Sequence, residues 1–454
     1  MTEPQPSISG IFTGQRSFFD KGGTRDLDAR LKALARLESA LQDLRQEMLD
    51  ALASDLGKPE IEAYLSEHVF LLEEIRLTFR SLRGWIKPAR AGHPVYFLPS
   101  RSQVIREPFG VALVIAPWNY PIQLALSPLI AAIAAGNTVI LKPSEMAPAS
   151  GRFLARIVDR CFPPEWVTVI PGGKETSEAL LEQAFDFIFF TGSTTVGRAI
   201  AEKAAKRLTP CVLELGGKCP CVVDRGADLP QTARRILIGK LFNAGQTCFA
   251  PDFVAVHESV RDDMVKALEE LLDSRPWEQE MARIVNRHHF DRLRGLIQGD
   301  VIGKGDDDPQ RLHLAPRILP RAEWDDPAME EEIFGPILPV VGFSSLDGLI
   351  ERLRGHPTPL ALYCFSRDEA FIRTLLERVP SGGACINDVG KQAMNLHLPF
   401  GGAGASGHGC YRGRHGVEAF SRPRSVTRRY FLPDPFELLP PRDRAMERLR
   451  KWLR

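Results

Sequence analysis

The sequence predicts an α/β protein built from two domains, and three observations carry this prediction. The chain has 454 residues, which is more than one hydrophobic core ordinarily accommodates. Hydrophobic side chains make up 44% of it and charged side chains 25%, as in globular domains. From about residue 110, short apolar runs alternate with amphipathic stretches. Such alternation is typical of βαβ units, whose parallel sheet is buried on both faces.

The elements of the first domain follow in order along the chain. Residues 26–86 predict helices, because apolar positions recur three and four apart in "LDARLKALARLESALQDLRQEML". Residues 124–136, "LALSPLIAAIAAG", predict a buried helix rather than a membrane span, since the tract is short and contains a proline. Buried strands are predicted at "VALVIAPW", "TVILKP", "VTVIPG", "FDFIFFTG" and "CVLELGG".

A second alternation predicts a second α/β domain, after a boundary within 210–216 that we draw between 210 and 211. Its helices are predicted at "LPQTARRILIGKLF", "DDMVKALEELLD", "LDGLIERLR" and "AFIRTLLERV". Its strands are predicted at "FVAVH", "ILPVVGF", "LALYCFS" and "GACIND". The glycine-rich stretch 399–413, "PFGGAGASGHGCYRG", predicts an irregular connection.

Composition and charge argue against several classes of partner and site. With 58 basic and 57 acidic side chains, the chain offers no electrostatic reason to expect a nucleic acid. The opening "MTEPQPSISG" lacks the basic and apolar segments of a signal peptide. None of the eight cysteines forms a CxxC, so we predict no metal site, and "CPC" at 219–221 fits alternate positions of a strand. Unpaired cysteines favour a reducing compartment, and we expect the cytoplasm.

Three residues suited to catalysis lie at predicted strand ends or in loops. Cys248 lies in the loop "FNAGQTCFAP", although a lone cysteine is more often an inert buried residue. Glu214 ends the strand "CVLELGG" in an apolar setting, which suits a general base, but a salt-bridged structural glutamate fits this pattern as well. Asn119 in "APWNYP" could donate to an oxyanion or simply serve a turn.

Other polar residues suit a nucleotide cofactor. Lys142 and Glu145 in "LKPSE" could contact ribose hydroxyls or be surface charges. Gly192 lies where "FFTGSTTVG" passes from strand to helix, which favours a bound phosphate, yet the GxxxxG spacing is not the dinucleotide fingerprint. In "EEIFGP", Glu332 and Phe334 share one face of an extended segment and could hold ribose hydroxyls and pack a flat ring.

These stretches are more specific together than singly. Over about residues 10–430 the chain contains, in order, "PWNYP", "LKPSE", "FTGST", "LELGGK", "GQTC", "EEIFGP" and "LPFGG". It thus resembles the aldehyde dehydrogenase superfamily, and most closely its class 3 branch of medium-chain, fatty and aromatic aldehyde dehydrogenases. The stretch "LTPCVLELGGKCPCVVD" and the short N-terminal arm carry the class 3 likeness. The resemblance implies a Rossmann-type N-terminal cofactor domain, an α/β catalytic domain and a small oligomerisation extension.

The resemblance also implies a role for each candidate. Cys248 is the nucleophile, Asn119 and the Cys248 backbone N–H receive the oxyanion, and Glu214 activates the water that hydrolyses the thioester. The implied cofactor contacts are Lys142 and Glu145 for the adenosine ribose, Gly192 and Ser193 for the pyrophosphate, and Glu332 and Phe334 for the nicotinamide ribose and ring. The segment 389–397 has no family pattern to carry over, and Cys219 stands where serine is commoner.

The implied activity is NAD-dependent oxidation of a medium- or long-chain aliphatic or aromatic aldehyde to the free acid, with NADP as a second cofactor. An acylating enzyme that uses coenzyme A and a catalytically silent structural protein are the alternatives. Acylating members usually lack the glutamate found here at position 214, which counts against the first.

The resemblance divides the chain into three parts. Residues 1–210 bind NAD(P), with a helical N-terminal part and an oligomerisation segment near 88–107, and residues 211–398 form the catalytic domain. Residues 399–454 hold the connection, an oligomerisation strand and a basic amphipathic tail, "ELLPPRDRAMERLRKWLR". We expect a homodimer and no transmembrane segment. The tail could contact protein, a membrane surface or solvent, and we favour protein.

Overall fold

The computed structural model describes residues 7–94, 97–277, 280–432 and 442–452. Its first part is helical, as the periodicity predicts. Asp26 accepts hydrogen bonds from the amides of Asp28 and Ala29 at the start of the second helix, and Gly57 ends the third in the left-handed conformation. The helices here are α1 (Ile8–Asp20), α2 (Leu27–Asp43), α3 (Arg45–Leu56), α4 (Glu60–Ala63), the π-helix η1 (Tyr64–Val69) and α5 (Phe70–Trp85).

The first six-stranded sheet has the order β14-β7-β6-β3-β4-β5, and only the β14–β7 pair is antiparallel. From the central β3 the chain proceeds to β4 and β5 on one side and to β6 and β7 on the other, so the strand order reverses between β3 and β6. Ligands of open α/β sheets bind at such a reversal. The strands are β3 (Val111–Ile115), β4 (Thr138–Lys142), β5 (Val167–Val169), β6 (Phe187–Thr191), β7 (Cys211–Glu214) and β14 (Gly407–His408).

Helices cover both faces of this sheet, which is why its central strands are apolar at every position. Ala112 and Val114 of β3 face a core shared with α2, α5 and the fully buried α6. Val111 and Leu113 face the opposite core, to which α8 and α9 contribute. The covering helices after β3 are α6 (Gln123–Ala135), α7 (Pro148–Cys161), α8 (Lys174–Leu181) and α9 (Thr194–Ala205). The prediction of a buried helix over 124–136 is confirmed.

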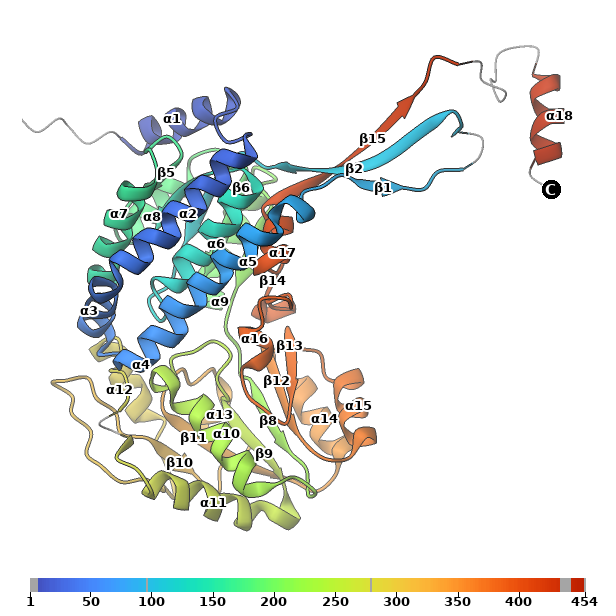
Figure 1. Cartoon of the computed structure of the whole chain (residues 1–454). Coiled ribbons are helices and arrows are strands. Elements are labelled where there is room, and N and C mark those ends of the chain that lie inside the picture. Colours follow the sequence, from blue (N-terminus) through green and yellow to red (C-terminus); the bar gives the residue numbers. More distant parts are fainter. Residues whose placement is uncertain (1–6, 95–96, 278–279, 433–441, 453–454) are drawn as a thin grey trace, which may run out of the picture.

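The second six-stranded sheet is parallel throughout, in the order β10-β11-β9-β8-β12-β13, and forms the lower lobe in Figure 1. Its strands are β8 (Pro220–Val223), β9 (Phe253–His257), β10 (Arg317–Leu319), β11 (Ile337–Phe343), β12 (Ala361–Phe365) and β13 (Gly383–Ile386). Its helices are α10 (Leu229–Leu241), η3 (Phe242–Gly245), η4 (Glu258–Val260), α11 (Arg261–Asp273), α12 (Arg287–Gly295), α13 (Pro327–Glu330), α14 (Leu346–Gly355), α15 (Glu369–Arg378) and α16 (Lys391–Met394). The short β10 is the strand that periodicity does not predict.

Two boundaries differ from those drawn on the sequence. β7 pairs with β6, so the chain changes sheets between Glu214 and Pro220 rather than between 210 and 211. The stretch 399–413 is not wholly irregular, because it supplies β14, which follows η6 (Gly404–Ser406) and pairs with β7. Pairing covers hydrogen-bonding groups that β7 would otherwise expose at the sheet edge.

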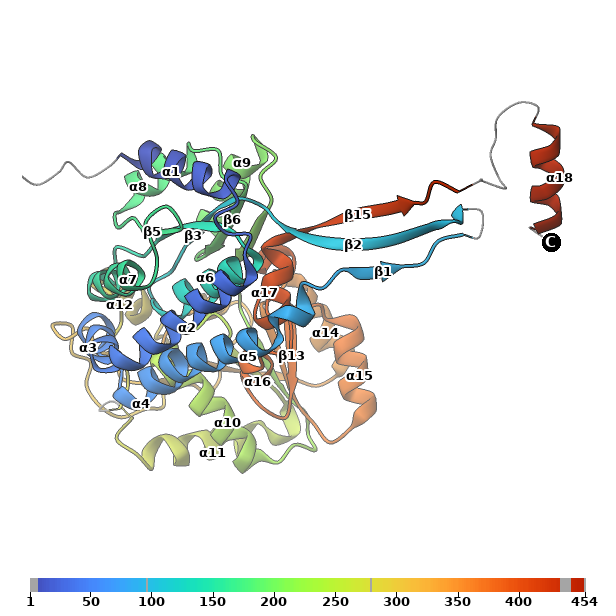
Figure 2. The same ribbon diagram turned by 45° about the horizontal axis from the view of Figure 1, so that its top comes forward.

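A three-stranded antiparallel arm projects from the two lobes (Figures 1 and 2). It joins β1 (Ala89–Ala91) and β2 (Ser100–Pro108) to β15 (Ser421–Arg429), which follows α17 (Gly413–Ala419). The structure therefore combines the segment near 88–107 with a C-terminal strand, the two parts expected to serve oligomerisation. Beyond the arm lies α18 (Asp443–Trp452), while the tail segments 433–441 and 453–454 are outside the described residues.

Within the described ranges, none of the helices combines the length and apolar character needed to cross a bilayer. All eight cysteines lie in these ranges and are free thiols. Cys219 and Cys221 are fully buried at the start of β8, in agreement with the strand predicted for "CPC".

Candidate active site

The predicted site residues gather along the carboxyl-terminal edge of the first sheet. Ile115, the last residue of β3, lies opposite Lys142 on β4 and Phe190 on β6, and Thr191 lies opposite Glu214 on β7. The loops that follow these strands carry "PWNYP", "LKPSE", "FTGST" and "LELGG". Parallel strands thus bring four separate motifs to the reversal of strand order between β3 and β6.

Lys142 and Glu145 form an ion pair at the end of β4, with Nζ 2.8 Å from Oε2. The lysine side chain is buried and the glutamate side chain is half exposed. Burial opposes ionisation of Glu145, but the hydrogen bonds from Lys142 and from its own backbone amide hold its pKa below the ordinary value. An ionised carboxylate with exposed surface can accept hydrogen bonds from ribose hydroxyls.

The loop after β6 leads into α9, and the start of this helix is exposed to solvent. Ser193 caps this helix by accepting a hydrogen bond from the amide of Val196, and Gly192 donates to the backbone oxygen of Glu214 over 3.0 Å. A side chain at Gly192 would collide with the ring of Phe190, since its Cβ would lie 2.5 Å from Cζ. Glycine here keeps the approach to the helix N-terminus clear, where a diphosphate is favoured.

Cys248 follows a strained loop. Asn243 and Ala244 both have φ of 53°, and Gly245 has φ of 75°. A Cβ on Gly245 would lie 2.2 Å from the backbone oxygen of Gly335, so only glycine fits. Asn243 and Ala244, two successive non-glycine residues in the left-handed region, store strain of the kind found at functional sites.

Asn119 is fixed to this loop by hydrogen bonds. Its Nδ2 donates to the backbone oxygen of Gln246 over 3.0 Å, and its own backbone oxygen accepts from Asn243 Nδ2 over 2.9 Å. Lys58 Nζ donates to the same Asn119 oxygen over 3.1 Å and forms a buried ion pair of 2.5 Å with Glu67. Lys58 and Glu67 lie in no motif, so the sequence pattern does not single them out.

Glu214 is a buried carboxyl with no hydrogen-bond partner. It is 3% exposed, and neither Oε1 nor Oε2 finds a donor among the described residues. Burial raises its pKa well above 4.5, and Arg412 opposes the rise. Among the described residues no cation pairs with this carboxyl, so a salt bridge does not account for it, and both of its oxygens are free to accept a proton.

The thiol of Cys248 is not activated by a lowered pKa. Burial raises its pKa, the nearby Glu332 and Glu214 raise it further, and Arg412 opposes them. A thiol in such a setting reacts as a nucleophile only when a base takes its proton or a cation stabilises the thiolate.

Glu332 and Phe334 close the site from the second sheet. A Cβ on Gly216 would lie 2.0 Å from Glu332 Oε2, so this carboxyl rests directly on the loop after Glu214. Burial and then Asp252 raise the pKa of Glu332 to about 8. The ring of Phe334 meets Trp118 edge-on at 5.4 Å. Glu332 and Glu214 both lie close enough to Cys248 to raise its pKa.

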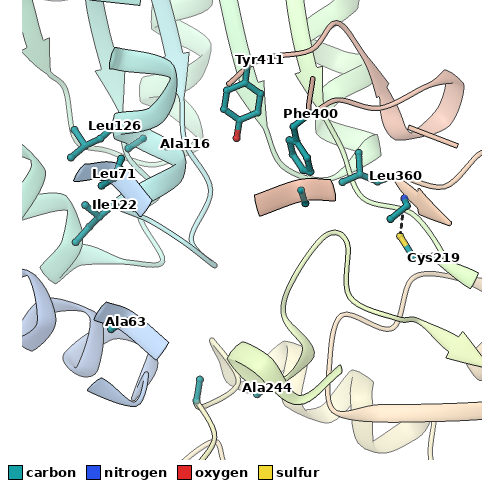
Figure 3. Packing of buried hydrophobic residues seen from close by; sticks show 14 of the residues in the cluster. Ala63, Leu71, Ala116, Ile122, Leu126, Cys219, Ala244, Leu360, Phe400 and Tyr411 are labelled. Atoms are coloured by element: carbon teal, nitrogen blue, oxygen red, sulfur yellow. Dashed lines mark hydrogen bonds between the residues drawn. The ribbon is translucent and has the colours of Figure 1, made fainter. Parts of the chain in front are cut away.

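Buried charges lie behind Glu332. Lys218 Nζ is 2.6 Å from Asp252 Oδ2 and also donates to the backbone oxygens of Ala328 and Glu331. These bonds hold the segment that carries Glu332 against "LELGGK". Figure 3 shows part of the buried hydrophobic core, with Phe400 and Tyr411 side by side and Ile122 and Leu126 on the other side of the view. No cluster of three or more metal-ligating side chains occurs in the part of the chain that the structure describes.

The chain is similar to known proteins over nearly its whole length. The sequence model of the "Aldehyde dehydrogenase family" matches residues 15–426. The chain is 40% identical to 4,4'-diaponeurosporen-aldehyde dehydrogenase of Staphylococcus aureus (strain NCTC 8325 / PS 47) over 92% of this chain and 93% of that protein. It is 42% identical to aldehyde dehydrogenase family 3 member B1 of Mus musculus, over 90% of this chain and 89% of that protein.

A solved structure, the substrate bound state of Staphylococcus aureus AldH, superposes with a TM-score of 0.95 at 37% identity, over 99% of this chain and all of that one. The chain belongs to the aldehyde dehydrogenase family. The expected class 3 likeness and the expected fold are confirmed.

This aldehyde dehydrogenase is an NAD(P)-dependent enzyme that oxidises an aldehyde to the carboxylic acid. Its residues fit the cofactor: a half-exposed carboxylate beside a buried lysine, an open helix N-terminus, and a cleared glycine turn lie along one sheet edge. When bound, the nicotinamide accepts the hydride.

Proposed function

We propose that Cys248, Asn119 and Glu214 carry out the oxidation through a thioester on Cys248. The observation that supports this most directly is the buried Glu214 carboxyl. Neither of its oxygens has a hydrogen-bond partner among the described residues, and it lies close enough to Cys248 to raise the pKa of the thiol. A base that must serve a water molecule needs free lone pairs facing the acyl group, and this carboxyl has them.

The proposed reaction begins when Cys248 releases its thiol proton to solvent. The Cys248 thiolate then adds to the aldehyde carbon, and the oxyanion is received by Asn119 Nδ2 and the Cys248 backbone N–H. Hydride loss converts the adduct to a thioester. Water then adds to the thioester carbon while Glu214 takes its proton, and the thiolate leaves as the acid is released. Asn119 keeps one amide hydrogen for the oxyanion while the other bonds Gln246.

The cofactor roles proposed for the other six residues follow from their positions. Glu145 and Lys142 bind the adenosine ribose, Gly192 and Ser193 face the pyrophosphate, and Glu332 binds the nicotinamide ribose with Phe334 beside the ring. The ionised Glu145 repels a 2′-phosphate, which favours NAD over NADP.

The proposed substrates are medium- or long-chain aliphatic or aromatic aldehydes. Ile61 on α4, Leu65 on η1, Met394 on α16 and Leu398 expose between 42% and 64% of their surface. The first two residues lie just before Phe70, and the last two lie just after Ala393. Arg412 joins these two segments, because it stacks on Phe70 and donates to the backbone oxygen of Ala393, and it lies close to Cys248. An apolar chain that passes these side chains would cover them. The S. aureus relative is itself named for a 4,4'-diaponeurosporen aldehyde.

We also propose that the protein is a cytoplasmic homodimer held by its arm. All three residues of β1 are exposed, and Phe431 and Leu432 expose apolar surface at the outer end. An isolated three-stranded ribbon with exposed apolar tips gains stability by pairing. The first sheet would then bind the cofactor, the second would complete the catalytic site, and α18 would contact protein rather than membrane.

One assay tests the proposed activity against its alternatives. Reduction of NAD and of NADP is followed with short, medium, long-chain and aromatic aldehydes, with and without coenzyme A. Acid release without coenzyme A, fastest with apolar aldehydes, is expected. Dependence on coenzyme A would identify an acylating enzyme, and absence of reduction with every aldehyde would identify a silent protein.

A further inference from the structure

Arg412 is a buried cation that the sequence patterns and the implied roles leave out. It is 3% exposed and has φ of 86°, between β14 and α17. Its guanidinium lies over the ring of Phe400 at 4.3 Å and over that of Phe70 at 4.6 Å. The two rings hold it from opposite parts of the chain, so its position is fixed by packing.

This guanidinium has few polar partners. Nη1 donates to the backbone oxygen of Ala393, while Nε is buried without a hydrogen-bond acceptor among the described residues. Arg412 also forms none of the ion pairs found within those residues. A buried arginine without a carboxylate partner is costly to keep, so its charge is available to other groups nearby.

The fold brings the Arg412 guanidinium near Cys248 and Glu214. β14 places Gly407 opposite Glu214, and the chain reaches Arg412 shortly afterwards. Phe400, which stacks on Arg412, also meets the ring of Phe249, the neighbour of Cys248, at 6.0 Å. Arg412 lowers the pKa of both Glu214 and Cys248, against the rise that burial causes in each.

We propose that Arg412 is a positioning residue that acts through Cys248 and Glu214, its fixed unpaired charge stabilising the thiolate and the carboxylate in an otherwise apolar pocket. The proposal rests on the roles proposed for these two residues. Neither the nucleophile role of Cys248 nor the base role of Glu214 by itself requires this positive charge. Without Arg412, the groups that act on Glu214 and Cys248 would include no cation to favour their ionised forms.

Other titratable groups lie near Cys248, Glu214 and Arg412, and the test variants leave these groups unchanged. Those that interact with Cys248, Glu214 or Arg412 are Glu74, Cys219, Glu332, Tyr120, Cys410 and Tyr411. All six are acids whose charged form is an anion. Arg412 is the cation among the groups that act on Cys248, so its neutral substitution removes the one charge contribution that lowers the pKa of the thiol.

The test measures the reactivity of Cys248 rather than turnover. Full-length wild type, Arg412→Met and Arg412→Lys are alkylated with iodoacetamide between about pH 6 and 9, and the Cys248 peptide is followed by mass spectrometry. In R412M the thiolate fraction should fall about tenfold. Because a more basic thiolate is a better nucleophile, the alkylation rate should fall about three- to fourfold at each pH. R412K retains the charge and should stay near wild type.

Matched variants separate charge from packing. Arg414→Met removes an exposed arginine of α17 that pairs with Glu418, and it should leave alkylation unchanged. Thermal unfolding and NAD binding report on folding, and Arg412→Gln replaces R412M if the latter does not fold. An unchanged rate in the neutral variants, or an equal loss in R412K, would overturn the proposal. Full activity of wild type after stoichiometric Cys248 alkylation would instead overturn the nucleophile assignment and leave the electrostatic effect measurable.

Discussion

Substitution of Glu214 by glutamine separates hydride transfer from hydrolysis. The amide keeps the shape of the carboxyl but cannot take a proton from water. Because Glu214 accepts no hydrogen bond among the described residues, the change removes no protein contact of this kind. General-base assistance is worth about 10² to 10⁴ in rate, or roughly 3 to 5 kcal/mol in the barrier to deacylation.

Rapid mixing of Glu214→Gln with aldehyde and NAD should give a burst of reduced cofactor of up to one per active site, followed by slow turnover. The trapped acyl group should appear in the intact mass as an adduct on Cys248. Glu182→Gln, which removes a surface carboxylate paired with Lys203 at 3.0 Å, serves as control and should turn over normally.

The same variant should change stability with pH. The unfolded chain releases the proton of Glu214 above about pH 4.5, while the buried carboxyl retains it, because its pKa is raised on folding. Stability from this group is thus complete below pH 4.5 and is lost as pH rises toward the folded pKa. At pH 7, well above the unfolded value of about 4.5, part of this stability is therefore already lost. Glutamine does not titrate, so the variant does not lose stability in this way as the pH rises. The free energy of unfolding of the variant should therefore increase relative to that of wild type over this pH range.

Urea unfolding at about pH 5 and pH 7 measures this gain. The unpaired amide hydrogens cost about 1 to 3 kcal/mol at both pH values, so the difference between the two is the informative quantity. If the burst vanished while aldehyde and NAD still bound, Glu214 would have to act earlier, by deprotonating Cys248, whose own raised pKa requires a base. A stability difference independent of pH would refute the electrostatic reasoning.

Three further predictions follow from the same geometry. Cys248→Ser should lose at least about 10³-fold in kcat while thermal unfolding and NAD binding stay unchanged, and turnover like wild type would move the nucleophile elsewhere. NAD should exceed NADP in kcat/KM by about tenfold, and Glu145→Gln should narrow the ratio; a clear preference for NADP in wild type would contradict the ribose contact. Lys58→Met leaves the buried Glu67 unpaired and should lower stability by about 3 to 5 kcal/mol in urea unfolding, a loss that the absence of any midpoint shift would disprove.

The sequence by itself determined the elements and their burial. The apolar runs at 111–115, 138–142 and 187–191 are strands buried at every position, because helices cover both faces of a parallel sheet. The motif order also identified the family, and the candidate residues at strand ends lie at one edge, as parallel pairing requires. These features are local or follow from regular strand geometry, so short stretches of sequence carry them.

Only the tertiary structure decided how the pocket is charged. The glycine-rich stretch 399–413 supplies β14, and its pairing with β7 is not encoded in that irregular sequence. The raised pKa of the Cys248 thiol depends on burial and on Glu332 and Glu214, which approach it from distant segments. Arg412 lies in a glycine-rich stretch without periodicity, and its place between Phe70 and Phe400 exists only after folding. Electrostatic effects depend on distance and burial in space, and spacing along the chain determines neither.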